Sequence, residues 1–232
     1  MPKPLLVILS GAGISAESGL KTFRDAGGLW EGQRVEDVAT PEAWAKNPLL
    51  VLEFYNQRRK QLNEVEPNAA HAGLKALEEF FQVTIITQNV DDLHERAGSE
   101  HVVHLHGELK KVRSTKDENL IYNMDGWELK LGDVCVLGSQ LRPHIVWFGE
   151  PVPLVEYATE IISKANFVAV IGSSMQVYPA AGLIYYAPSN AVKYYLDPKA
   201  TQISGISNLY CIQEKASVGI EKLKQMLFNS KL

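Results

Sequence analysis

The chain has 232 residues, of which 46% are hydrophobic and 22% charged, and its net charge at pH 7 is −4. These values exclude disordered, collagen-like and coiled-coil classes, and the acidic balance disfavours binding to nucleic acid. The two cysteines, Cys135 and Cys211, are too few for a disulfide framework or a four-cysteine zinc site, and they fit a reducing, cytoplasmic compartment. The N-terminal apolar run Leu5–Leu9 is too short for a signal peptide or a membrane span, so we expect no membrane association.

Short apolar runs alternate with amphipathic segments along most of the chain. The expected strands are Leu5–Leu9, Val83–Thr87, Val102–Leu105, Ile145–Phe148, Phe167–Ile171 and Val192–Leu196. The expected helices are Pro48–Leu62, Ala72–Phe81, Leu154–Ala165 and a last helix capped by Ser217. This alternation predicts an α/β fold in which a parallel sheet is joined by helical crossovers.

Two stretches interrupt the alternation. Residues of about 29–66 contain a helical pattern without a good strand and are expected to form a helical insertion. Within about 108–142, the runs Leu120-Ile121-Tyr122 and Trp127–Leu131 flank Asp125-Gly126, which predicts a hairpin. This second stretch is therefore expected to be a small β module beside the main sheet.

A glycine-rich segment follows the first expected strand. Gly11-Ala12-Gly13-Ile14-Ser15-Ala16 matches the G-x-G-x-x-A form of the dinucleotide fingerprint, in which backbone N–H groups and the start of a helix bind a pyrophosphate. An ordinary tight turn is an alternative interpretation of the same residues. The continuation also does not fit a classical dehydrogenase, because no second strand ending in an acidic residue follows promptly. The next segment, Thr22–Trp30, could fold over a nucleotide or form a surface turn.

A polar segment, Gln88-Asn89-Val90-Asp91, follows the second expected strand. The carboxyl ends of parallel strands are where open α/β sheets bind ligands. The side-chain amides of Gln88 and Asn89 can donate and accept hydrogen bonds and so suit an amide ligand. Asp91 could pair with a developing cation or could cap the helix that follows.

Histidines gather near the third expected strand. His104 and His106 alternate along it and could face the same side, which would allow a metal site. No carboxylate or further histidine lies at a supporting spacing, so a single catalytic His106 at the end of the strand is the better interpretation.

These and two later motifs occur in one order across nearly the whole chain. They are Gly11–Gly19, Thr22-Phe23-Arg24, Gln88-Asn89-Val90-Asp91, His104-Leu105-His106-Gly107, Val146–Glu150 and Gly172-Ser173-Ser174. The set resembles the sirtuins, the NAD-dependent protein lysine deacylases. The resemblance implies a Rossmann-like domain with two inserted modules. It also implies acylated-lysine proteins as substrates, with nicotinamide, O-acyl-ADP-ribose and free lysine as products. A mono-ADP-ribosyltransferase and a non-enzymatic sensor of NAD or ADP-ribose remain alternatives.

The resemblance also assigns roles to individual residues. The residues implied to bind NAD are Gly11, Ala12, Gly13, Ser15, Glu17, Thr22, Phe23, Arg24, Trp30, Gln88, Asn89, Asp91, His106, Gly172, Ser173, Ser174, Asp197 and Ala216. Those implied to bind the acyl-lysine peptide are Tyr55, Arg58, Val146, Trp147, Phe148, Gly149, Glu150 and Val177. The resemblance makes His106 the general base and adds Asn89 and Asp91 to the catalytic set.

The chain departs from the family pattern at two places. Sirtuins usually carry four cysteines in the small module, but Ser114 stands where the first pair would begin and only Cys135 remains in this region. A tetrahedral structural zinc needs four ligands, so we predict a zinc-free module. Asp197 stands where an asparagine is common, and because a carboxylate can accept from ribose hydroxyls, we expect NAD binding to be retained.

The segment Phe54–Arg59 is similar to the sirtuin branch that removes succinyl and malonyl groups. Tyr55 and Arg58 are three residues apart on an expected helix and therefore share a face. Taken alone, Arg58, Arg59 and Lys60 would be read as a solvated basic face. The resemblance favours a pocket for acidic acyl groups, with weaker deacetylation, and the sequence leaves the oligomeric state open.

Overall fold

The computed structural model describes residues 2–21, 29–30 and 32–230. Its centre is a parallel six-stranded sheet in the order β11-β10-β9-β1-β4-β5. The strands are β1 (Leu5–Ser10), β4 (Gln82–Thr87), β5 (Val102–His104), β9 (Phe167–Ile171), β10 (Val192–Leu196) and β11 (Leu209–Ile212). The α/β fold with a parallel sheet is thereby confirmed.

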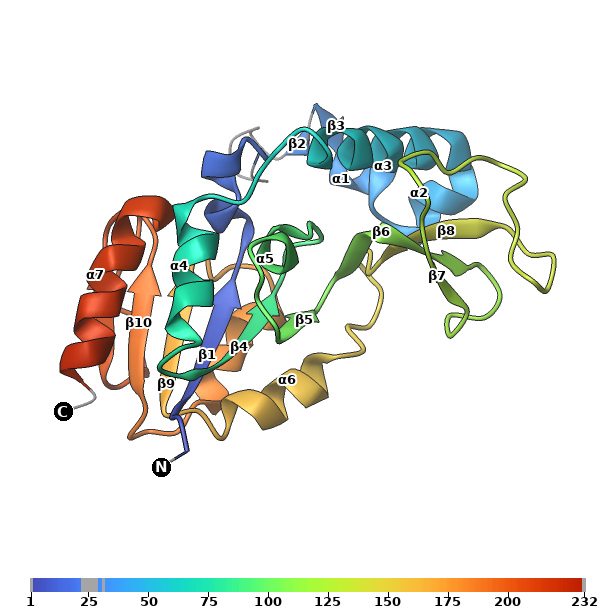
Figure 1. Ribbon diagram of the computed structural model, residues 1–232. Coiled ribbons are helices and arrows are strands. Elements are labelled where there is room, and N and C mark those ends of the chain that lie inside the picture. The colour runs from blue at the N-terminus through green and yellow to red at the C-terminus, as the bar shows by residue number, and fades with distance from the viewer. Residues whose placement is uncertain (1, 22–28, 31, 231–232) are drawn as a thin grey trace.

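Helices cover both faces of this sheet (Figure 1). They are α4 (Ala69–Leu77) and α7 (Ala216–Asn229) on one face, and α6 (Val155–Ile162) and the 3-10 helix η3 (Ala180–Tyr186) on the other. Because side chains alternate along a strand, Leu6 and Ile8 of β1 pack with α4 and α7, whereas Val7 and Leu9 pack with α6 and η3. Within the described part of the chain, no helix is long and apolar enough to span a membrane.

The helical module lies beside the sheet (Figure 1). Its elements are β2 (Leu29–Trp30), β3 (Gln33–Arg34), α1 (Val35–Val38), α2 (Pro41–Lys46) and α3 (Pro48–Leu62). Helix α3 has the bounds expected from sequence, because the Asn47 side chain accepts a hydrogen bond from the Leu50 amide (3.2 Å) and Pro48 occupies the first turn.

The β module is a three-stranded antiparallel sheet in the order β7-β6-β8, and it packs against α3. Its strands are β6 (Gly107–Ser114), β7 (Ile121–Asn123) and β8 (Leu141–Ile145). Between β4 and β5, the short helix α5 (Leu93–Arg96) completes the fold. The two modules stand together, away from the helices of the parallel sheet (Figure 1).

Several predictions of secondary structure were wrong. The apolar run Ile145–Phe148 is no parallel strand, because Ile145 ends β8 and pairs antiparallel with β6. The hairpin across Asp125-Gly126 does not form either, since β7 pairs with β6 and Trp127–Leu131 is not a strand. Strand β11 was missed, because it is only four residues long.

Two expected helix starts also differ. Gly11 is followed by two 3-10 turns, η1 (Ala12–Ile14) and η2 (Ala16–Ser18), and not directly by an α-helix. Ser217 is not the cap of α7; its amide and hydroxyl donate to the carboxylate of Glu17 at 2.9 and 2.7 Å. The N-terminus of α7 is thus satisfied by a side chain 200 residues away in sequence.

Gly107 begins β6 directly after His106, at φ +82°, where a Cβ would lie 2.0 Å from the carbonyl oxygen of His144. Gly126 has φ +97° but open space around it. We expect Gly126→Ala to lower the free energy of unfolding by about 1–2 kcal/mol through backbone strain alone. Gly107→Ala should cost about 1–3 kcal/mol more because of the clash. Equal losses in urea unfolding would contradict this.

Candidate active site

A cleft of about 790 Å³ is formed by the loops at the carboxyl ends of the parallel strands together with both modules. Its volume lies in the range of small-molecule sites. The expected site residues that line it are Gly11, Ala12, Gly13, Ser15, Glu17, Tyr55, Arg58, Gln88, Asn89, Asp91, His106, Val146, Trp147, Phe148, Gly149, Glu150, Gly172, Ser173, Ser174, Val177, Asp197 and Ala216. Thr22, Phe23, Arg24 and the side chain of Trp30 lie outside the described residues.

The floor of the cleft is a backbone contact between two glycine loops. The Gly13 amide donates to the Gly172 carbonyl at 2.8 Å. A Cβ on Gly13 would lie 2.7 Å from the Gly172 Cα, and one on Gly172, whose φ is +61°, would lie 2.3 Å from the Ile14 nitrogen. Side chains are therefore excluded here, which leaves bare backbone facing the cleft, as close approach to a pyrophosphate requires.

A buried polar network joins the loops after β1 and β4. Ser15 Oγ donates to Asp91 Oδ2 at 3.0 Å, and Asn89 Nδ2 donates to Ser15 Oγ at 3.2 Å. Burial raises the pKa of Asp91 to about 6, although hydrogen bonds from the Leu93 amide and Ser15 oppose this. Asp91 also fulfils the capping alternative, because its Oδ1 accepts from the Leu93 amide at the start of α5. The buried carboxylate is held in place by these bonds and remains mostly ionised above neutral pH.

The geometry of His106 fixes which ring nitrogen carries a proton. Its Nδ1 lies 3.1 Å from the Gln88 carbonyl oxygen, and because a carbonyl only accepts, Nδ1 is the donor. Burial lowers the pKa of His106, against the opposing effect of this hydrogen bond. The ring is therefore neutral near pH 7, with Nε2 as an unprotonated base. The Gln88 side chain, in turn, donates to Ser173 Oγ at 3.2 Å and links the β4 and β9 loops.

His104 has a different role from His106. Its Nδ1 lies 3.1 Å from the Asn89 carbonyl oxygen, and its Nε2 lies 2.7 Å from Glu95 Oε1. Burial disfavours its charged form, but the Glu95 carboxylate outweighs burial and raises the pKa of His104. His104 therefore holds the backbone of the loop after β4. No group of His, Cys, Asp or Glu among the described residues is arranged to hold a metal.

Tyr55 and Arg58 lie one turn apart on α3, and both line the cleft. The fully buried Tyr55 accepts a hydrogen bond at its hydroxyl oxygen from Trp147 Nε1 at 3.0 Å. Burial lowers the pKa of the half-buried Arg58 to about 10, so it remains a cation at neutral pH. The solvated basic face is wrong for Arg59, which is 1% exposed and donates to the Leu109 carbonyl at 2.6 Å.

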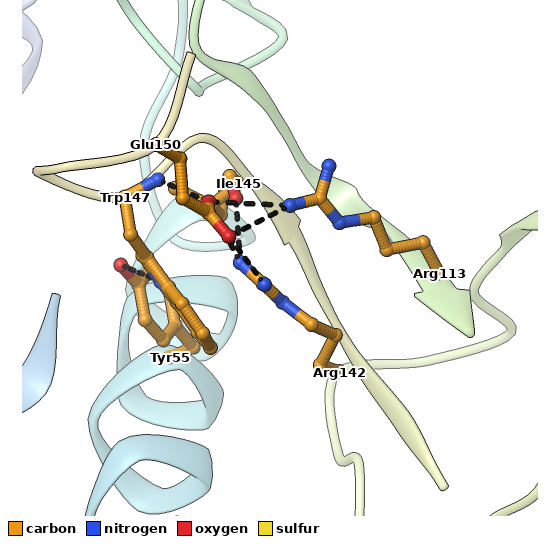
Figure 2. Close-up of polar contacts among 6 residues, drawn as sticks. All are labelled: Tyr55, Arg113, Arg142, Ile145, Trp147 and Glu150. Carbon is orange, nitrogen blue, oxygen red and sulfur yellow. Dashed lines mark hydrogen bonds and ion pairs between the residues drawn. The ribbon is translucent and has the colours of Figure 1, made fainter. Parts of the chain in front are cut away.

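Two carboxylates that were expected to bind peptide or NAD accept hydrogen bonds from groups of the protein itself. Glu150 borders the cleft, but its carboxylate accepts from Arg142, Arg113 and the Trp147 amide (Figure 2). The buried Asp197, at the end of β10, accepts from the Lys199 amide at 2.9 Å. Both still line the cleft.

Sequence analysis missed some lining residues, among them Gln61, Lys199 and Lys215. Gln61 lies three residues after Arg58 on α3, so helical spacing alone could have found it. The two lysines follow β10 and β11, and the carboxyl ends of these strands were the signal.

The tip of the β module is closed by hydrogen bonds among small side chains. Ser114 Oγ lies 2.6 Å from Ser139 Oγ, which lies 3.0 Å from Cys135 Sγ, and all three residues are buried. The amides of Lys116 and Asp117 donate to Ser114 Oγ at 3.1 Å. One thiol and two hydroxyls do not fit the four ligands of a tetrahedral structural zinc, so we assign this module no metal chemistry.

Comparison with known proteins gives a family match. The model of the Sir2 family matches residues 11–179. A Helicobacter pylori protein named NAD-dependent protein deacylase is 57% identical over 224 residues, which are 96% of this chain and 94% of that protein. A Bacteroides thetaiotaomicron protein of the same name is 53% identical over 230 residues, 96% of this chain and 97% of that protein.

Solved structures agree in fold. A mutant Sir2 homologue in complex with ADP-ribose superposes with a TM-score of 0.88 at 37% identity, over 98% of this chain and 93% of that one. A Sir2 homologue–NAD complex gives a TM-score of 0.87 at 36% identity, over 98% of this chain and 91% of that one. A Sir2 complex with a p53 peptide and NAD+ gives a TM-score of 0.78 at 28% identity, over 97% of this chain and 93% of that one.

The Ser114–Ser139–Cys135 cluster predicts that the β module is stable without metal. We expect purified protein to contain no stoichiometric zinc, and its thermal midpoint to be unchanged by a strong chelator, because hydrogen bonds and packing close the module. Elemental analysis and melting curves with and without chelator test this. About one zinc per chain, or a chelator-induced drop in the midpoint, would refute it.

Proposed function

The chain belongs to the Sir2 family, and we propose that it is an NAD-dependent protein lysine deacylase that prefers succinyl and malonyl groups over acetyl groups. The observation that carries the acyl preference is the cationic Arg58 beside Tyr55 in the wall of the cleft. The relatives named NAD-dependent protein deacylase support the activity at the coarser level.

The residues of the cleft fit NAD. The bare backbone at Gly13 and Gly172 provides the cradle for its pyrophosphate, and the amides of Gln88 and Asn89 suit its carboxamide. Asp197 can accept hydrogen bonds from ribose hydroxyls. When bound, NAD supplies the ADP-ribosyl acceptor for the acyl group, and its nicotinamide is released.

The chain contributes proton transfer and electrostatics to this reaction. His106 Nε2 accepts a proton from a hydroxyl group in the cleft, while the Gln88 carbonyl holds the ring by Nδ1. The buried carboxylate of Asp91, fixed by Ser15 and the Leu93 amide, favours positive charge that develops near it. Because these groups are oriented before substrate binds, little reorganisation is needed during the reaction.

The acyl end of the cleft suits a carboxylate. Burying the terminal charge of a succinyl or malonyl group is costly unless that charge is paired. Arg58 offers a planar set of donors that can bind a carboxylate through two hydrogen bonds, and Tyr55 adds a hydroxyl on the same helix face. An acetyl group has no charge to pair, so Arg58 and Tyr55 contribute less to its binding.

Arg58→Met should lower kcat/KM for succinyl- and malonyl-lysine peptides by about tenfold to a hundredfold, since hydrogen bonds to charged groups contribute about 1.5–3 kcal/mol. Activity on acetyl-lysine should be spared or improved. The matched control is Lys60→Met, which removes an exposed cation of the same helix that does not line the cleft.

Parallel kinetics with NAD and the three peptides provide the readout. Equal losses on all three would make Arg58 structural and end the acidic-pocket proposal. Transfer of ADP-ribose to protein without loss of the acyl group, detected by mass spectrometry, would instead favour a mono-ADP-ribosyltransferase.

His106→Ala should lower turnover by about 10²–10⁴-fold, because it removes the base, while NAD still binds. His104→Ala removes a ring that contacts the Asn89 carbonyl but does not line the cleft, so its loss should be smaller. Turnover and NAD titration by calorimetry separate the two effects. An unimpaired His106→Ala protein would mean that another group is the base.

A further inference from the structure

At one side of the cleft, the carboxylate of Glu150 contacts two arginines, as Figure 2 shows. Glu150 Oε1 accepts from Arg142 Nη1 at 2.7 Å, and Glu150 Oε2 accepts from Arg142 Nη2 at 3.1 Å. Arg113 Nη2 lies 3.3 and 3.2 Å from the same two oxygens. Arg142 Nη2 also donates to the Ile145 carbonyl at 3.0 Å. We refer to Arg113, Arg142 and Glu150 as the Glu150 cluster.

The Glu150 cluster holds Trp147 from two directions. The Arg142 guanidinium carbon lies 3.3 Å from the centre of the Trp147 ring, so the two planar groups are in stacking contact. Glu150 Oε2 accepts from the Trp147 backbone amide at 2.8 Å. Both the ring and the backbone of this 2% exposed residue are therefore fixed by groups of the cluster.

Trp147, held in this way, is hydrogen-bonded to Tyr55. Its indole Nε1 donates to the Tyr55 hydroxyl oxygen at 3.0 Å, across 92 residues of sequence (Figure 2). An N–H donor on one side of a phenol oxygen restricts the directions that the hydroxyl hydrogen can take. The chain of contacts thus runs from Glu150 through Arg142 and Trp147 to the residue that shares the acyl wall with Arg58.

The charges of the cluster favour this role. Burial disfavours the charged forms of Arg142 and Glu150. At Glu150, the bonds from Arg142 and the Trp147 amide outweigh burial and lower its pKa, whereas at Arg142 burial still lowers the pKa against the opposing effect of Glu150. A buried ion pair contributes little net stability, whereas removing one partner is costly, so the cluster can fix a local geometry without adding much to the free energy of unfolding.

We propose that Arg113, Arg142 and Glu150 are positioning residues for acyl selection, which they exert through Trp147 by fixing the Tyr55 hydroxyl. The inference rests on the proposed preference for acidic acyl groups. None of the three cluster residues needs to contact the acyl group. The cluster therefore sets the ratio of activity on succinyl-lysine to activity on acetyl-lysine, and acts on KM more than on kcat.

The sharpest variant is Trp147→Phe, because it keeps an aromatic ring under Arg142 and the backbone amide for Glu150 but deletes the indole donor. We expect KM for a succinyl-lysine peptide to rise about threefold to tenfold more than KM for an acetyl-lysine peptide, as for loss of one hydrogen bond, and the effect on KM to exceed the effect on kcat. Trp127→Phe, the same change at an exposed tryptophan outside the cleft, is the control and should leave both peptides unaffected.

A double-mutant cycle with Tyr55→Phe tests the path. If Trp147 acts through the Tyr55 hydroxyl, Trp147→Phe should cause no further change in the succinyl-to-acetyl ratio once that hydroxyl is gone. Glu150→Gln, which keeps an acceptor oxygen but removes the charge, should lower the ratio in the same direction. Glu150→Asp, which keeps the charge, should retain part of the succinyl-to-acetyl ratio that Glu150→Gln loses.

The outcomes separate the two proposals. A wild-type protein without preference for succinyl- over acetyl-lysine would end the proposed acyl preference and this inference with it. A wild-type preference combined with independent, multiplying effects of Trp147→Phe and Tyr55→Phe would overturn the inference alone. Equal losses on both peptides in Glu150→Gln would do the same, because a merely structural role does not discriminate between acyl groups.

Discussion

The architecture of the site depends on one contact, in which the backbone of Gly13 meets the backbone of Gly172. No Cβ fits at either position, so the loops after β1 and β9 approach each other as closely as main chains can. This contact sets the floor of the cleft and leaves its backbone uncovered by side chains of Gly13 and Gly172. It also brings the β4 loop within reach, since the Gln88 side chain bonds to Ser173, the residue after Gly172. A substitution at either glycine would therefore displace three loops together.

The chemistry above that floor is held largely by main-chain groups. His106 and His104 each use a ring nitrogen to contact a carbonyl of the β4 loop, at Gln88 and Asn89. These bonds fix the tautomer of His106, and burial keeps its ring neutral. The inserted modules supply another part of the cleft lining, with Tyr55 and Arg58 on α3 and Trp147 after β8. The loops of the parallel sheet thus position the residues proposed to bind NAD and to act as the base, and the modules provide the surface proposed to select the acyl group.

Sequence was sufficient where local rules decide. Asn47 and Pro48 mark the start of α3, and the convergence of parallel strand ends explains why motifs far apart in sequence line one cleft. Sequence was insufficient to predict contacts between residues far apart in the chain, or to assign an apolar run whose hydrophobic periodicity fits more than one sheet. The run Ile145–Phe148 is equally apolar in either sheet, and only pairing with β6 assigns it. The contact between Glu17 and Ser217 has no local pattern. Arg59 resembles a solvated residue until its carbonyl partners on the β module are known.

The central claim is that this cleft couples lysine deacylation to consumption of NAD. The most direct test is to quantify nicotinamide and free lysine together, with a succinyl-lysine peptide as substrate and with NAD either present or rigorously removed. We predict equal amounts of both products at every time point and no free lysine without NAD. Free lysine released in the absence of NAD, or nicotinamide formed without a matching amount of free lysine, would contradict the account.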